Sequence, residues 1–302
     1  MKFFAVFCLL SFYSPPFATG VEIDWHVHES SQFKINYMEM DEKAARNLAT
    51  MLEEESKKLN RQFGFELSKP IGVYVCQTQE IFDQLTGHMV PDWGEGVADA
   101  SRNAIILKSS SLFEKRRRLS KLVRHELIHI LIAQMVGFPK PIPRWFNEGL
   151  ACYFSYDEEF SAGKAISKAM LSGSILSTEE IDDVLHFQTE KARLAYEQSF
   201  ALVKFMQEEF GNLAAVDLVR ELAKGTTFDN AFLGITGEEL AEFELRWLNY
   251  IEQKYRWRFL LDFETFIWIF MVLLFIFVFV AIKIRNRRTM KRWDKEEGLT
   301  NP

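Results

Sequence analysis

The stretch KLVRHELIHILIAQMVGFPKPIPRWFNEGLA, residues 121–151, places two histidines and a glutamate inside an otherwise apolar run. His125 and His129 are four residues apart, so on a helix they lie on one face, one turn apart. Their imidazole nitrogens could then bind one zinc ion at about 2.1 Å each. Glu126 lies about 100° round the helix, where it can reach an attacking water without being a ligand. Two core histidines with satisfied hydrogen bonds are the alternative interpretation.

A third ligand is available where such a site needs one. Glu148 follows His129 by 19 residues, after a proline-rich turn and near the start of a second helical pattern. A second helix that packs back on the first would present this carboxylate to the metal. Three protein ligands with one open position are typical of catalytic zinc, whereas structural zinc closes with four. The sequence therefore predicts one Zn2+ per chain, held by His125, His129 and Glu148.

The segments around this stretch predict an α+β fold. Alternating or apolar runs indicate strands at residues 32–37, 71–76 and 103–108. Helical periodicity is found at residues 42–63, 79–85, 119–135, 144–154, 195–211, 214–225 and 238–255. Asp41 is the expected N-cap of the first of these helices, Ser177 and Glu180 form a capping-box pattern, and residues 87–96 are expected to be a loop. A small sheet with the zinc helix is thus followed by an α-helical part.

Both ends of the chain have apolar segments typical of membrane targeting. Residues 3–13, FFAVFCLLSFY, follow Lys2 and precede two prolines, which is typical of a secretory signal peptide cleaved near Gly20; an uncleaved anchor is the alternative. Residues 266–282 carry no charge and make about 25 Å of helix, enough for a short transmembrane span. Basic residues follow this span closely, which predicts a cytoplasmic C-terminus. We expect a single-pass protein of the cell membrane whose body is extracytoplasmic, either periplasmic or extracellular.

Charge and cysteine content narrow the classes of partner. The formal net charge is −6 although the C-terminal tail is basic, so the body of the chain is acidic. An acidic body argues against nucleic acid as a partner. Cys76 and Cys152 would remain in an oxidising compartment after cleavage, where a disulfide and two buried free thiols are equally compatible with the sequence. The sequence has no CxxC motif, which excludes a cysteine-based metal site.

Residues 119–153 resemble the gluzincin metallopeptidases of the peptidase MA-like superfamily. HELIH resembles their HExxH motif, and PRWFNEGLA resembles their P-x-W-x-x-E-G-x-A element, which carries the glutamate ligand. The resemblance implies a zincin-like catalytic domain that uses zinc, with Glu126 as general base. It implies Tyr196 as the donor that stabilises the oxyanion, with Tyr153 and His186 as weaker candidates.

The sequence departs from these relatives in two places. The GAMEN motif, with which the aminopeptidases of this group hold a free N-terminus, is absent, and the nearest stretch reads GEGVADA. An endopeptidase is therefore favoured. Thermolysin-like relatives have an aspartate four residues after the glutamate ligand, where this chain has Cys152, so Asn147 or a backbone carbonyl is expected to orient a histidine instead. By resemblance, the strand at 103–108 is expected to be the edge that pairs with substrate, with residues 94–101 beside it.

These observations define an expected organisation and function. The segments are a signal peptide (1–20), a zincin-like catalytic domain (21–176), a helical subdomain that completes the cleft (177–260), a transmembrane helix (264–283) and a basic cytoplasmic tail (284–302). The expected function is hydrolysis of peptides or proteins by a membrane-anchored zinc endopeptidase. The alternatives are an inactive zincin-like scaffold or binding protein of the cell envelope, and a receptor or adhesin with incidental zinc.

Overall fold

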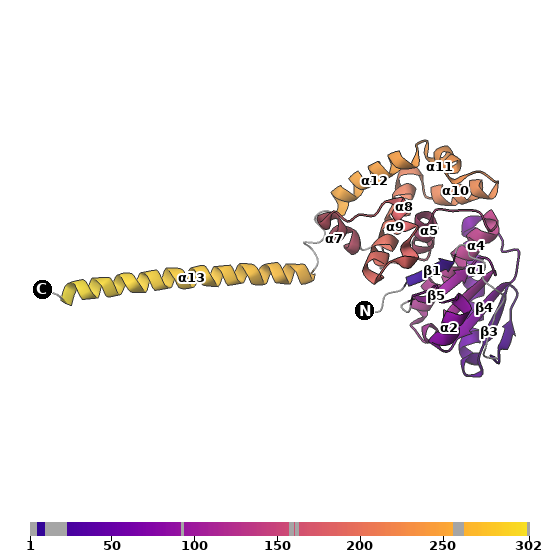
Figure 1. Ribbon diagram of the computed structural model, residues 1–302, viewed down its shortest axis with the longest axis horizontal. Coiled ribbons are helices and arrows are strands. Elements are labelled where there is room, and N and C mark those ends of the chain that lie inside the picture. The colour runs from indigo at the N-terminus through magenta and orange to yellow at the C-terminus, as the bar shows by residue number, and fades with distance from the viewer. Residues whose placement is uncertain are drawn as a thin grey trace.

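A computed structural model describes residues 5–9, 23–91, 94–156, 160, 163–255 and 263–300. Figure 1 shows a mixed α and β body and one long C-terminal helix that extends away from it. The sheet and its covering helices form one part of the body, and a group of helices forms the other. The α+β class with a small mixed sheet is therefore confirmed. The proposed division of the chain into domains stays a prediction.

The sheet has six strands among the described residues, in the order β1-β5-β6-β4-β3-β2. Their bounds are β1 (Ala5–Leu9), β2 (His26–Glu29), β3 (Phe33–Tyr37), β4 (Ile71–Cys76), β5 (Gly94–Asp99) and β6 (Ala104–Lys108). Strands β3, β4 and β6 run parallel, whereas β2 and β5 pair antiparallel with β3 and β6. Strand β1 runs parallel to β5, along the outer edge of the sheet.

Both faces of the sheet are covered by helices. Helices α1 (Glu42–Phe63) and α4 (Arg116–Val136) pack against each other and against the sheet, while α2 (Gln79–Thr86) contacts β4 and β6. The side chains of β4 and β6 alternate between two apolar clusters, as the two-residue period of a strand requires. Val73 and Ile105, for example, join the main core, whereas Cys76 and Ile106 join a smaller cluster with residues of α2.

The predicted bounds of α1 are confirmed, but its start is not capped as expected. Asp41 occupies the N-cap position and makes no capping hydrogen bond. Its Oδ1 instead accepts a hydrogen bond of 2.7 Å from Ser109 Oγ, at the start of α3 (Ser109–Leu112). The carboxylate therefore ties α1 to the end of β6. The capping box of Ser177 and Glu180 at α8 (Thr178–Ile181) is present with both of its hydrogen bonds.

The prediction of a loop over residues 87–96 is wrong in its last part, because β5 begins at Gly94. The sequence pattern does not indicate this strand, because GEGVAD has small residues at positions where an alternation of apolar side chains would be expected. A Cβ at Gly96 would lie 2.7 Å from Leu107 Cδ2 and 3.3 Å from Glu126 Oε1, so larger side chains do not fit there. Strand β6 consequently lies inside the sheet, and the expectation that it forms the edge is also wrong.

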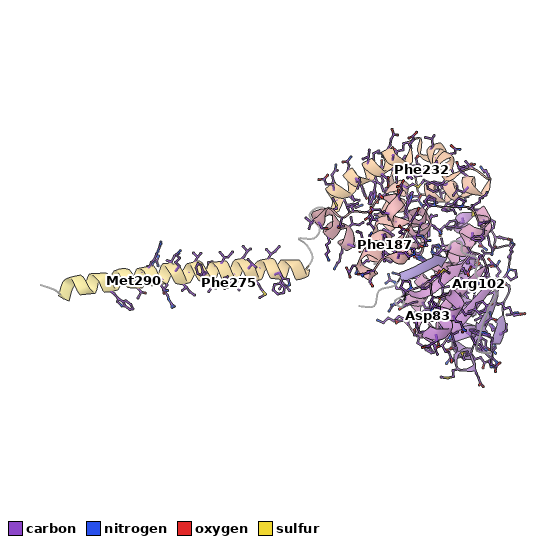
Figure 2. All side chains as sticks on the ribbon, in the orientation of Figure 1. Asp83, Arg102, Phe187, Phe232, Phe275 and Met290 are labelled. Carbon is purple, nitrogen blue, oxygen red and sulfur yellow. The ribbon has the colours of Figure 1, made fainter. Side chains whose placement is uncertain are left out.

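The second part of the body is helical. Helix α5 (Arg144–Phe154) packs most extensively against α9 (Thr189–Phe210). The remaining elements are η1 (Glu39–Asp41), α7 (Lys164–Ser172), η2 (Val184–His186), α10 (Ala214–Ala223), α11 (Phe228–Thr236) and α12 (Leu240–Tyr255). Stacked and edge-on aromatic rings join α5 to this group, with Trp145 and Phe228 6.0 Å apart and Phe232 and Phe243 5.2 Å apart. Figure 2 shows Phe232 within this helical group.

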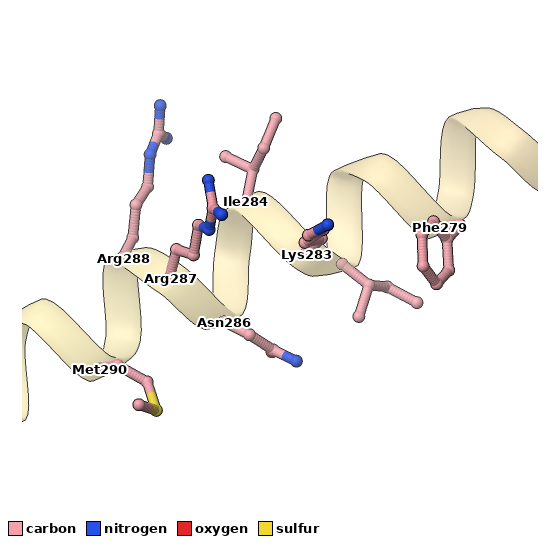
Figure 3. A pocket seen from close by; sticks show the side chains of 8 residues that line it. Phe279, Lys283, Ile284, Asn286, Arg287, Arg288 and Met290 are labelled. Carbon is pink, nitrogen blue, oxygen red and sulfur yellow. The ribbon is translucent and has the colours of Figure 1, made fainter.

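Helix α13 (Phe263–Thr300) is continuous and contains the predicted transmembrane span. Residues 267–290 form a helix long and apolar enough to cross a membrane, and its apolar part is not buried inside the molecule. Figure 2 labels Phe275 on this helix, and Figure 3 shows Lys283, Arg287 and Arg288 on the turns that follow. The predicted cleavage point near Gly20 lies outside the described residues.

Candidate metal centre

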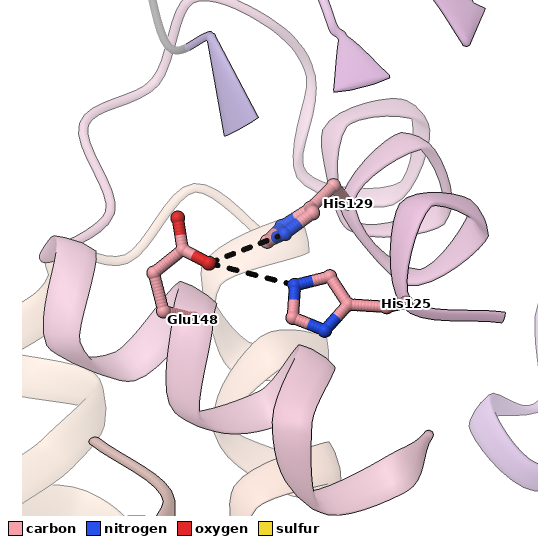
Figure 4. A group of neighbouring side chains, drawn as sticks. All are labelled: His125, His129 and Glu148. Atoms are coloured by element: carbon pink, nitrogen blue, oxygen red, sulfur yellow. Dashed lines mark ion pairs between the residues drawn. The ribbon is translucent and has the colours of Figure 1, made fainter. Parts of the chain in front are cut away.

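Helices α4 and α5 bring together the three side chains predicted to bind metal (Figure 4). His125 and His129 lie on adjacent turns of α4, with ring centroids 4.8 Å apart. Glu148 projects from α5, and its Oε2 lies 3.5 Å from the Nε2 atom of each histidine. All three side chains are at most 3% exposed. Among the described residues, these three side chains form the cluster of His, Cys, Asp or Glu that could hold a metal ion.

The spacing of these atoms fits a metal ion better than a hydrogen-bonded core. Ligand atoms about 2.1 Å from a tetrahedral zinc are about 3.4 Å apart, close to the observed separations. A hydrogen bond between nitrogen and oxygen is normally shorter, about 2.9 Å. Neither oxygen of Glu148 has a hydrogen-bond partner among the described residues, although the side chain is buried. Because a buried carboxylate without such partners is costly, the donor set is better explained by a cation.

The surroundings shift the pKa values of Glu126 and Glu148 in opposite directions. Burial raises the pKa of Glu148, but the neighbouring His129 and the contacts from both imidazoles outweigh burial and lower the pKa to about 2. Burial raises the pKa of Glu126 well above its ordinary value; the Glu148 carboxylate acts in the same direction, and His129 opposes both. Glu148 is thus held as a carboxylate, while Glu126 has a stronger affinity for a proton. This difference is the one expected between a ligand and a general base.

Tyr196 is buried on α9. Of the three candidates for oxyanion stabilisation, it is the one whose pKa responds to the charges of Glu148 and Glu126. Its ring stacks on that of Phe160 at 5.6 Å, and it is 1% exposed. Burial raises its pKa well above the ordinary value, and the Glu148 carboxylate raises it further. Tyr153 instead packs against Phe154 and Phe200, and His186 is exposed on η2.

The approach of α9 to the metal-binding helices depends on Gly149. A Cβ on this residue would lie 2.4 Å from the backbone oxygen of Ser199 and 2.6 Å from Val203 Cγ2. Such contacts do not occur, so only glycine allows α5 and α9 to cross this closely. The residue that follows Glu148 therefore controls how near α9, and with it Tyr196, comes to the ligands.

Comparison with known protein families identifies the family of this chain. A model of the peptidase MA superfamily matches residues 53–253, more than half of the chain, including every residue of the candidate centre. The chain belongs to the peptidase MA superfamily. Among solved structures, this peptidase MA chain is similar to Legionella pneumophila aminopeptidase A in complex with aspartic acid, with a TM-score of 0.44 and 14% identity. The similarity covers 74% of this chain and 27% of that chain, so the chain spans about a quarter of that aminopeptidase. No curated protein matches the sequence.

The departure at Cys152 has a structural counterpart in this peptidase MA chain. Asn147 Oδ1 lies 3.2 Å from His129 Nδ1, so the amide oxygen can accept the ring N–H and leave Nε2 for a metal. Cys76 and Cys152 are both buried and are not joined in a disulfide, which resolves the choice that the sequence left open. Sequence reasoning missed Gly149, Phe160 and the buried Arg124. The one sequence signal was a basic residue, Arg124, within the apolar run of α4.

Proposed function

We propose that this peptidase MA chain is a zinc-dependent endopeptidase, anchored in a membrane by α13 and active on its extracytoplasmic side. The observation that carries the proposal is the buried group of His125, His129 and Glu148, with Glu126 next to it on α4. The ligand spacing, the orphaned carboxylate of Glu148 and the family all favour zinc in this position.

The side chains of the centre suit hydrolysis of a peptide bond. Zinc, when bound, would supply a Lewis acid that polarises the scissile carbonyl and increases the acidity of water. Glu126 would take a proton from the attacking water and pass it to the leaving amine. Its raised pKa favours this role, because a weakly basic carboxylate would not hold the proton between the two steps. Glu148 and the two histidines would remain ligands throughout.

Tyr196 is proposed as the second donor to the developing oxyanion. Its raised pKa keeps the hydroxyl protonated through the neutral range, which a hydrogen-bond donor requires. The stacked ring of Phe160 holds the phenol ring and excludes water from one of its faces. A donor in a buried site contributes more than the same donor in water.

The charges along β5 favour an endopeptidase over an aminopeptidase. An aminopeptidase needs an acidic group that is available to a substrate's terminal ammonium. The two acidic side chains of β5 are engaged with arginines instead: Glu95 lies 3.0 Å from Arg118, and Asp99 lies 2.5 Å from Arg102. Asp99 also accepts hydrogen bonds from Ser101. Both carboxylates are thus already paired with arginines, which disfavours their use for binding a free N-terminus.

The outer edge of β5 is the proposed binding site for an extended substrate. In the full chain this edge pairs with β1, in register from Val6 opposite Gly96 to Leu9 opposite Asp99, and β1 also contacts α4. A peptide that binds as an added strand needs an exposed sheet edge, and β1 occupies this edge of β5 in the full chain. Once a signal peptide is removed, the same backbone groups become available to a peptide that lies beside the zinc helix.

Zinc content and hydrolysis, measured in detergent on the chain that begins at Val21 and keeps α13, test the proposal. We expect about one zinc per wild-type chain, a large loss of zinc in Glu148→Ala, and hydrolysis of unfolded casein by the wild type alone. Glu126→Gln is the matched variant, because it removes the base and keeps the ligands; it should retain zinc and lose hydrolysis. A folded wild type without zinc would exclude the enzyme. Zinc without hydrolysis of any peptide in a mixed library would favour the scaffold alternative.

A further inference from the structure

Arg124 is a buried cation directly beside the first predicted metal ligand. It precedes His125 on α4, and its side chain is only 5% exposed. Burial of a charged guanidinium is costly unless its donors are satisfied. The proposed hydrolysis assigns no role to this residue, and its contacts show what it holds together.

The guanidinium donates to three oxygen atoms from two other helices. Its Nε donates to the backbone oxygen of Phe154 at 2.5 Å, its Nη1 to Glu55 Oε2 at 2.9 Å and its Nη2 to Gln62 Oε1 at 2.7 Å. Tyr156 covers the group, with its ring centre 5.0 Å from the guanidinium carbon. Arg124 therefore joins α4 to α1 and to the last residue of α5.

These contacts give α5 two attachments to α4. Near the ligands, Asn147 contacts His129 at 3.2 Å, and at the other end Phe154 accepts from Arg124. The two points are seven residues apart, about 10 Å along the helix. Packing against α9 and α4 holds α5 along its length. The hydrogen bond from Arg124 additionally fixes the last turn of α5, and through it the direction in which Glu148 projects.

We propose that Arg124 is a positioning residue, which sets the zinc affinity of the centre by holding the C-terminal end of α5 in place. The cation also suits the partial negative charge of a helix C-terminus. A planar guanidinium can satisfy three acceptors in fixed directions, whereas a lysine ammonium cannot reproduce this geometry. This inference rests on the zinc site proposed above.

The test measures zinc affinity by competition with a chelator, in the full-length chain in detergent, for Arg124→Met and Arg124→Lys. Loss of a residue that orients a ligand typically weakens metal binding by about 10- to 100-fold, and we expect a change of this size for R124M. R124K should give an intermediate loss. The absorption bands of the cobalt-loaded chain provide a second readout, because they report the ligand geometry and should change in R124M.

Arg220→Met is the matched control. Arg220 on α10 also donates to the last carbonyl of a helix, Phe63 of α1, and to a carboxylate, Asp217, but it makes no such contact with α5. R220M should lower the unfolding temperature and leave the zinc affinity and the cobalt bands unchanged.

Wild-type zinc affinity and cobalt bands in R124M would overturn the proposal and leave Arg124 a purely structural residue. If R124M does not fold, the same two measurements on R124K decide between these outcomes. A wild-type chain without zinc would overturn the proposed function together with this inference.

Discussion

Gly149 controls the closest helix crossing next to the candidate centre. In Gly149→Ala the new methyl group would meet the backbone of Ser199 at 2.4 Å, so α5 and α9 must separate. We expect a loss of stability of about 1–3 kcal/mol, as for other overpacked sites, and a lower kcat because Tyr196 moves with α9. Gly234→Ala in α11 is the control, since its Cβ meets nothing within 4 Å. Equal thermal unfolding of G149A and the wild type would contradict this account.

Tyr196 is expected to act through its hydroxyl group alone. Tyr196→Phe keeps the stacked ring against Phe160, so folding and zinc content should not change. If the hydroxyl stabilises the oxyanion, kcat should fall by about 100- to 1,000-fold with little change in KM. Steady-state kinetics on a fluorogenic peptide measure both parameters. Tyr153→Phe serves as the control and should retain its activity; an unchanged kcat in Y196F would remove Tyr196 from the mechanism.

At the residue scale, the sequence predicts the relative positions of residues that lie on the same helix. The grouping of His125 with His129 follows from their spacing, and the geometry of these residues with Glu148 agrees with it. Their roles in binding and catalysis, like that of Tyr196, stay predictions. Arg124 could not be interpreted because its partners on α1 are 62 and 69 residues away in the chain. The steric demand at Gly149 likewise exists only after α9 has packed.

At the scale of elements, the contact between α1 and α4 makes stability depend on pH. Burial raises the pKa of Glu55, but hydrogen bonds from Lys58 and Arg124 outweigh burial, so the net pKa is below its ordinary value. A carboxyl whose pKa is lowered by folding contributes stability above its unfolded pKa, about 4.3, and this contribution is lost as pH falls through the folded pKa.

Glu55→Gln should therefore remove this acid sensitivity. We expect the variant to be less stable than the wild type by about 2 kcal/mol at pH 7, because a charge-assisted hydrogen bond is lost. The difference should shrink as pH falls from about 5 towards 3. Thermal unfolding across this range measures it. Glu53→Gln is a useful comparison. Burial raises the pKa of Glu53, but hydrogen bonds from Ser31 and Gln32 outweigh burial and lower it, so this variant should show a pH dependence that leaves the contact of Arg124 with Glu55 intact. A constant difference between E55Q and the wild type would contradict the assignment.

Elements with strong local signals were predicted well, and those defined by their neighbours were not. Helix α1 ends at Phe63 and is capped by Gly64, whose φ of 66° favours glycine, and its predicted bounds match the structure. Strand β5 was missed because its small residues are required by Leu107 and Glu126, which lie far along the chain. Helices α7 and α11 were missed as well.

At the scale of the whole molecule, α13 is expected to determine where the protein resides. A chain that ends after Tyr255 lacks this helix and should move from the membrane pellet to the soluble fraction with its zinc retained. A chain that ends after Met290 keeps the entire apolar stretch and should remain in the pellet after alkaline extraction. Membrane retention of the shorter chain would show that another surface binds the membrane.

The pairing of β1 with β5 has a consequence for the timing of activity. A precursor that keeps its first 20 residues carries its own competitor for the edge of β5, at an effective concentration that free peptides seldom reach. We expect a precursor with an uncleavable leader to bind zinc and hydrolyse no peptide, in an assay beside the chain that begins at Val21; equal rates would contradict this. The newly made enzyme would then be latent, and proteins in the compartment of its synthesis would be protected until export is complete.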